Sequence, residues 1–194
     1  MSGHDHPSAS DSGADRDVGL PPLPPDPQTL TYVELWNGAE ILIRKAGEEV
    51  SGSRWVFLSA LLMLSFCLEA YLDHAGPLLF GAAWREGKAA HAAKDAKLRL
   101  TLVCAACGVQ LEARHTYRTV ALTLLELRAS LGQATQLRLP QGKAIRGAGN
   151  TPPAPAWAAY CRRNVVLDYR AQLRLLLGKL HARLPADGRG PLSI

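Results

Sequence analysis

Apolar residues recur at intervals of three and four along most of the chain after residue 30, which is the period of an amphipathic helix. This pattern predicts helices over residues 31–49, 53–74, 91–107, 116–131 and 156–184. No stretch alternates apolar and polar residues well enough to compete as a strand. We therefore expect an all-α fold, a single helical bundle of about five to six helices.

The second of these helices is apolar almost all round, so it is expected to form the centre of the bundle. Gly76 and Pro77 are expected to close it just after His74. The segment 78–84 that follows is compatible with a short helix or with a packed loop.

The third helix, over 91–107, is expected to place Leu98, Leu102 and Ala105 on its buried face, since these residues follow at helical spacing.

Composition divides the chain into segments. Residues 1–29 are acidic and poor in apolar residues, with five prolines between residues 21 and 27, which predicts a disordered tail ending in a stiff spacer. A ligand for a proline-recognising domain is the alternative. The expected bundle covers residues 30–185, with a mobile basic loop at 133–154 and a frayed end at 186–194.

The net charge of +5 over 194 residues is unevenly distributed. Residues 1–29 hold five Asp and one Arg, and residues 30–127 hold ten basic and ten acidic side chains. Residues 128–194 hold eleven basic and two acidic side chains. The distribution argues against a uniformly basic DNA-coating protein and against a highly charged disordered chain.

No secretory signal or membrane span is evident in the sequence. The start lacks a basic segment followed by an apolar one. The longest uncharged apolar stretch, 55–68, falls short of the roughly 20 residues that a span requires. Four cysteines in a chain of this size do not indicate a disulfide scaffold. We therefore expect a cytoplasmic protein that does not enter a membrane.

Cys104 and Cys107 form a C-x-x-C motif. One such pair supplies half of a tetrahedral zinc site, and His115 is the nearest candidate for a third ligand. A redox pair would favour a helix N-terminus, whereas this one falls at the C-terminal end of a predicted helix, where the dipole raises a thiol pKa. Two buried thiols in the core are the favoured interpretation, with no metal and no cofactor.

The apolar second helix ends in polar residues. Glu69 and Asp73 are four residues apart and therefore share a face. A carboxylate on so apolar a helix must reach water or find a cation, and Lys97 and Arg128 are the expected partners. A structural ion pair is favoured over acid–base catalysis, since nothing in the spacing requires chemistry.

Read together, several blocks resemble a group of bacterial helical proteins in the HEPN superfamily. They are LSALLMLSFCLEAYLDHAGPLLF (58–80), a Lys-Leu pair at 97–98, and RHTYRTVALTLLELRASLG (114–132). The resemblance covers about residues 31–139 and rests on the order and phase of the blocks. It implies a helical bundle that forms a homodimer.

Many HEPN proteins are metal-independent ribonucleases with an Arg-x(4–6)-His motif at the dimer interface. The resemblance implies that the arginine contacts the scissile phosphate and that the histidine acts as acid or base. On this chain the arginine position is Arg128, and the histidine position is Gln133. Asp73 stands where the family has Asn, and Ala129 replaces the polar residue expected after the arginine.

These departures disfavour an active ribonuclease. Glutamine cannot exchange a proton near neutral pH, and loss of a general acid or base costs a factor of about 10² to 10⁴. His181, on the last predicted helix, is the remaining candidate for a substitute.

The last helix carries a stripe of arginines at spacings of seven and four: Arg163, Arg170 and Arg174. Further basic residues of the C-terminal third could join this stripe in lining a surface for RNA phosphates. They are Arg138, Lys143, Arg146 and Arg162. A solvated helix face is the alternative interpretation.

The sequence thus favours a HEPN-like protein with a degenerate catalytic motif that binds RNA, or a protein partner such as an antitoxin, through its basic C-terminal third. One alternative is a metal-independent HEPN-type endoribonuclease of the toxin or phage-defence type. A second is a helical scaffold or dimerisation protein without nucleic acid, in which Arg128 merely pairs with Glu69.

Overall fold

The computed structural model describes residues 30–48, 51–86, 95–112, 115–132 and 155–194 of the chain. Their elements are α1 (Thr31–Glu48), α2 (Ser53–Phe80), α3 (Ala83–Glu86), α5 (Ala96–Ala106), α6 (Thr116–Gly132), the 3-10 helix η1 (Ala156–Ala159) and α7 (Arg163–His181). These residues form helices and no strand, so the predicted all-α bundle is confirmed.

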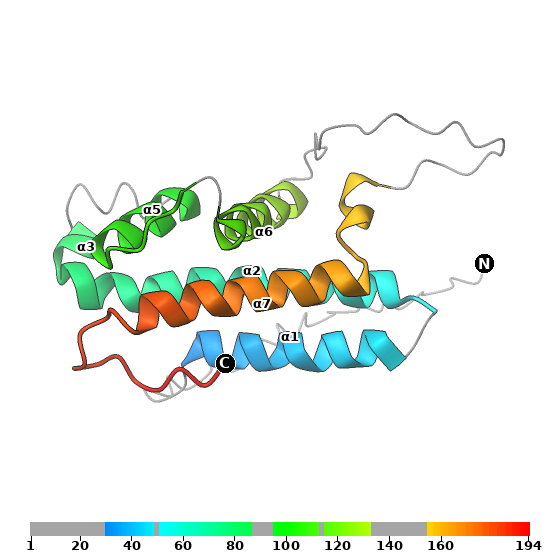
Figure 1. Cartoon of the computed structure of the whole chain (residues 1–194), viewed down its shortest axis with the longest axis horizontal. Coiled ribbons are helices and arrows are strands. Elements are labelled where there is room, and N and C mark those ends of the chain that lie inside the picture. The colour runs from blue at the N-terminus through cyan, green and yellow to red at the C-terminus, as the bar shows by residue number, and fades with distance from the viewer. Residues whose placement is uncertain (1–29, 49–50, 87–94, 113–114, 133–154) are drawn as a thin grey trace, which may run out of the picture.

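Helix α2 is the central element of the bundle (Figure 1). It contacts α1, α5, α6 and α7, and its contact with α1 is the most extensive. Helices α5 and α6 lie on the side of α2 away from α1, and α7 runs alongside α2 (Figure 1). A helix surrounded in this way must be apolar almost all round, as the sequence of α2 is.

The long helices α1, α2 and α7 pack against one another, so the ends of the three helices lie together at the two ends of the bundle. Helices α2 and α7 run in parallel, since Trp157 packs on Trp55 near their starts and His181 on Tyr71 further along. Helix α1 runs antiparallel to both, so its last turn lies beside the start of α7, as the approach of Arg163 to Gly47 shows.

The prediction that Gly76 and Pro77 close the second helix is wrong, because α2 continues to Phe80. Gly76 instead makes room for Trp84, since a Cβ at this position would lie 2.1 Å from the indole ring. The helix ends at Gly81, whose positive φ of 57° suits glycine and whose N–H donates to the carbonyl of Pro77. Residues 78–84 accordingly belong mostly to helices α2 and α3.

Helix α5 starts later than predicted and buries a different face. Asp95 caps it by accepting a hydrogen bond from the Lys97 N–H at 2.8 Å, so the helix begins at Ala96. The expected buried face is wrong in part, because Leu98 and Ala105 are exposed, whereas Leu102 is half-buried against the core. The buried residues of this helix are Leu100, Val103 and Cys104.

The predicted helix over 156–184 consists of two elements. Arg162 has an extended backbone that separates η1 from α7. The segment after α7 was expected to fray from residue 186, but it folds back along the bundle. The Tyr32 hydroxyl donates to the carbonyl of Pro191 at 3.4 Å, and Leu192 and Ile194 pack against the core.

By length and composition alone, α2 could cross a membrane, and 56% of its most apolar window is buried inside the bundle. The core helix of a soluble protein meets the same criteria, so α2 does not assign the protein to a location. The predicted tail at 1–29 and the predicted basic loop at 133–154, with Gln133, Arg138, Lys143 and Arg146, lie outside the described residues.

Candidate functional site

The most buried charges of the described chain form a group between α2, α5 and α6. We call Glu69, Asp73, Arg99 and Arg128 the polar cluster. Arg99 Nη2 donates to Glu69 Oε2 at 3.4 Å, and its Nη1 donates to Asp73 Oδ1. Arg128 Nη1 lies 3.2 Å from Glu69 Oε1, an ion pair without hydrogen-bond geometry. Glu69 thus lies between two arginines.

Burial explains why these groups pair. The side chains of Glu69 and Arg99 are only 12% and 11% exposed, so each would be costly without a countercharge. Asp73 and Arg128 extend the cluster toward solvent, with 56% and 43% of their side chains exposed. Two carboxylates and two guanidinium groups leave the cluster without net charge.

One predicted partner of Glu69 is confirmed and one is wrong. Arg128 pairs with Glu69 as expected. Lys97 instead binds Glu126 Oε1 at 2.7 Å, with both side chains about half exposed. Arg99 takes the predicted place of Lys97, because residues two apart on a helix lie on different faces. The sequence would have indicated Arg99 as the partner if the buried face of α5 had been predicted correctly, since Arg99 precedes the buried Val103 by one turn.

Arg128 is the residue that the HEPN resemblance would make catalytic. Besides its ion pair with Glu69, its guanidinium lies over the Phe66 ring, 5.6 Å from the centroid. Gln133, the other residue of the degenerate motif, lies outside the described residues.

The three histidines that the structure describes are engaged elsewhere. His181 is buried, with Nε2 3.2 Å from the carbonyl of Gly190 and Nδ1 3.4 Å from the Tyr71 hydroxyl. Burial lowers the pKa of His181. His74 lies 3.2 Å from the carbonyl of Arg189, and His115 stacks on Tyr117. None of the three contacts Arg128, so His181 does not complete the motif within one chain.

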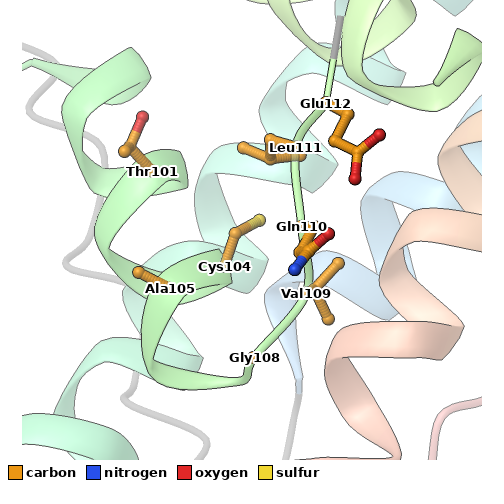
Figure 2. Close-up of a pocket in the computed structure, with 8 residues that line it drawn as sticks. All are labelled: Thr101, Cys104, Ala105, Gly108, Val109, Gln110, Leu111 and Glu112. Carbon is orange, nitrogen blue, oxygen red and sulfur yellow. The ribbon is translucent and has the colours of Figure 1, made fainter. Parts of the chain in front are cut away.

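The C-x-x-C motif is part of the core. Burial raises the pKa of Cys104 to about 12 and also raises the pKa of Cys107. Cys104 lies on the wall of a pocket of about 440 Å³, between Thr101 and Ala105 of α5 and the segment 108–112 (Figure 2). Among the described residues, no three His, Cys, Asp or Glu side chains gather as metal ligands, and His115 is not joined to the two thiols. The arrangement favours buried thiols over metal or redox chemistry.

The predicted arginine stripe on α7 is divided. Arg170 donates to Glu40 Oε2 of α1 at 3.0 Å, so this side chain has a structural partner. Arg163 and Arg174 are exposed and have no ion pair with any residue that the structure describes. Two of the three arginines therefore remain open to a ligand.

A surface that the sequence predicted only in part, through Arg162 and Arg163, lies where α1 ends and where α2 and α7 begin. We call Arg54, Trp55, Trp157, Arg162 and Arg163 the aromatic–basic end. The two indole rings lie 5.0 Å apart at 52°, and the Arg54 guanidinium lies 5.2 and 5.6 Å from their centroids. Trp55 is 56% exposed. The sequence offered one indication of this exposure: Trp55 lies in the first turn of a mostly buried helix and directly follows an arginine.

Comparisons of the chain with models of known families, with curated proteins and with solved structures produced no match. The resemblance to HEPN proteins therefore stays a prediction from the sequence.

Proposed function

We propose that the chain is a HEPN-like helical protein that binds RNA through its basic C-terminal third and does not cut it efficiently. One observation carries the proposal: Arg162, Arg163 and Arg174 are exposed and have no ion pair within the described part of the chain. An arginine without an ion pair is well suited to bind phosphate, since its guanidinium group presents several hydrogen-bond donors in a fixed plane.

The surroundings of Arg128 favour binding over cleavage. Its charge is opposed by Glu69, and none of the described histidines reaches it to act as acid or base. Gln133, at the motif's histidine position, offers hydrogen bonds but no proton exchange near neutral pH. We further propose that the protein is a cytoplasmic homodimer, as the HEPN resemblance and the sequence suggest.

A second candidate function is a helical scaffold that binds a protein and no nucleic acid. The pairing of Arg128 with Glu69 and of Arg170 with Glu40 favours it, because both arginines then serve the fold. The two candidate functions differ in the role of the unpaired arginines, which bind RNA phosphates in the first and contact no nucleic acid in the second.

Salt-dependent binding tests the proposal. Fluorescence anisotropy with a labelled, unstructured RNA should show an affinity that falls steeply with salt, as expected when phosphates are neutralised. Arg174→Ala should weaken binding a few-fold, as is typical of a lost phosphate contact. Lys179→Ala is the matched control, since it removes one exposed charge from the last turn of α7, on a different face from Arg174. Absence of salt-dependent binding to any RNA would contradict the proposal and favour the scaffold.

A cleavage assay separates the binding protein from the endoribonuclease. Wild-type protein with RNA and EDTA should give little cleavage, because the motif lacks its histidine. Gln133→His should raise cleavage if the site is a decayed nuclease. Efficient cutting by the wild type, abolished in a folded Arg128→Ala variant, would establish the enzyme instead.

A further inference from the structure

We propose that the aromatic–basic end binds single-stranded RNA by stacking an unpaired base on Trp55. The inference rests on the proposed RNA-binding function and adds to it the place of binding, the form of the RNA and the type of contact. It is carried by the geometry of the two tryptophans and Arg54, together with the charges around them.

Trp55 differs from the tryptophans of the core. Trp36 and Trp84 are 2% and 5% exposed, whereas Trp55 is 56% exposed. Leaving an indole in water forfeits much of the hydrophobic stabilisation that its burial would give. More than half of the Trp55 side chain is therefore accessible to a planar ligand.

Two neighbouring side chains hold the exposed indole in place. Trp157, from η1, packs on it at 5.0 Å between centroids, and Arg54 spans both rings. Arg54 also lies near Cys161: burial raises the pKa of this thiol, and the charge of Arg54 partly offsets the rise. Because its neighbours already fix Trp55, little side-chain entropy would be lost when a base stacks on it.

The charge around the tryptophans suits a polyanion. Arg162 and Arg163 stand at the start of α7, shortly after Trp157 in the chain. Arg163 approaches the last turn of α1, which also contains Lys45. The first turns of α2 and α7 contain no acidic residue, so the partial positive charge of both helix starts is not cancelled there. Glu48 is the one acidic side chain that the structure describes in the last turn of α1. A surplus of cations around an aromatic platform favours nucleic acid over an uncharged peptide.

Stacking on a protein side chain selects for single strands. In a duplex both faces of each internal base are covered by neighbouring bases, so an indole on the protein surface cannot stack on them. An unpaired base can turn outward and lie on the ring while its phosphates contact nearby arginines. Single-stranded RNA should therefore bind more tightly than the same sequence in a duplex.

Intrinsic tryptophan fluorescence tests this directly, because Trp36 and Trp84 are buried and a quenching ligand reaches only Trp55 and Trp157. The probes are an unstructured RNA of about 12 nucleotides and its duplex form. The single strand should quench the emission, and Trp55→Ala should lower its affinity at least about fivefold, with Trp55→Phe in between. The matched control is Ile41→Ala, which removes a 54% exposed apolar side chain from α1.

Each outcome decides between the two proposals. Salt-dependent binding that is equally tight for duplex and single strand, and unchanged in Trp55→Ala, would overturn this inference and leave the proposed function standing. Binding of neither RNA would overturn both. Loss of self-association in Trp55→Ala, with RNA affinity unchanged, would instead identify this end as a protein interface. Circular dichroism verifies that each variant folds.

Discussion

The polar cluster and the aromatic–basic end both contain arginines, but the arginines have different partners. In the polar cluster, Arg99 and Arg128 face Glu69, and the group is neutral and partly buried. At the aromatic–basic end, Arg162 and Arg163 have no carboxylate partner among the described residues, and Arg54 lies over indole rings. The same side chain serves the fold in one region and is available to a ligand in the other.

This difference changes how the basic C-terminal third is interpreted. Net charge alone treats every arginine as equivalent, yet Arg128 and Arg170 are neutralised by Glu69 and Glu40. Variants in the polar cluster should therefore change stability and leave RNA binding intact, whereas variants at the aromatic–basic end should do the reverse.

The largest expected effect on stability is that of Glu69→Gln. It removes the carboxylate that faces both Arg99 and Arg128 and leaves the mostly buried Arg99 with only the half-exposed Asp73 as a partner, at a cost of about 3 kcal/mol. The melting temperature should fall by about 5–10 °C, with RNA affinity of the folded protein unchanged. Glu126→Gln is the control, because it removes a carboxylate from an exposed pair and should cost less than about 1 kcal/mol. Equal effects of the two variants would contradict the account.

Arg128→Ala should have a smaller effect. Arg128 is 43% exposed and Glu69 keeps Arg99 as a partner, so solvent screening limits the loss to about 1 kcal/mol. Denaturant unfolding measures this loss. A large fall in RNA affinity at unchanged stability would show that Arg128 contacts RNA, as the endoribonuclease reading requires.

Arg170→Ala tests whether the paired and the unpaired arginines of α7 have different roles. Its ion pair with Glu40 is about one third exposed on both sides, so its removal should cost about 0.5 kcal/mol. RNA affinity should change less than in Arg174→Ala, since Arg174 has no partner in the described chain. Anisotropy titrations of the two variants at one salt concentration make the comparison, and a greater loss in Arg170→Ala would break the distinction.

The smallest expected effect is a pH dependence at the end of the bundle opposite the aromatic–basic end. Burial lowers the pKa of His181 from 6.5, so the unfolded chain takes up the proton at a higher pH than the folded one. His181 therefore costs no stability well above pH 6.5, and stability falls as the pH drops through that value. Thermal unfolding at about pH 7.5 and about pH 5.5 should show the loss, and His181→Gln should reduce it. A loss unaltered by the substitution would assign it to other groups.

The pattern of apolar residues predicts the helices and the central place of α2, because a helix that is apolar on every face has to be surrounded. It does not predict that α2 continues through Pro77 or that Trp84 packs against Gly76. That contact joins residues from two elements, and no local signal reports it.

The candidate sites were less predictable than the fold. The pair of Glu69 with Arg128 follows from the cost of burying a carboxylate, but Arg99 required the phase of α5, which the apolar residues gave wrongly. Trp55 belongs to a helix whose other apolar residues are mostly buried, so its exposure depends on where α2 emerges from the bundle. Such positions follow from packing geometry that local patterns do not contain.

The salt dependence of RNA binding, compared between two variants, tests the central claim most directly. For a single strand, each lost phosphate contact should reduce the slope of log K against log salt by about 0.7. The double substitution Arg162→Ala with Arg163→Ala should reduce the slope by about 1.4, and Arg128→Ala should leave it at the wild-type value. A slope that changes in Arg128→Ala and stays constant in the double variant would contradict the division between paired and unpaired arginines.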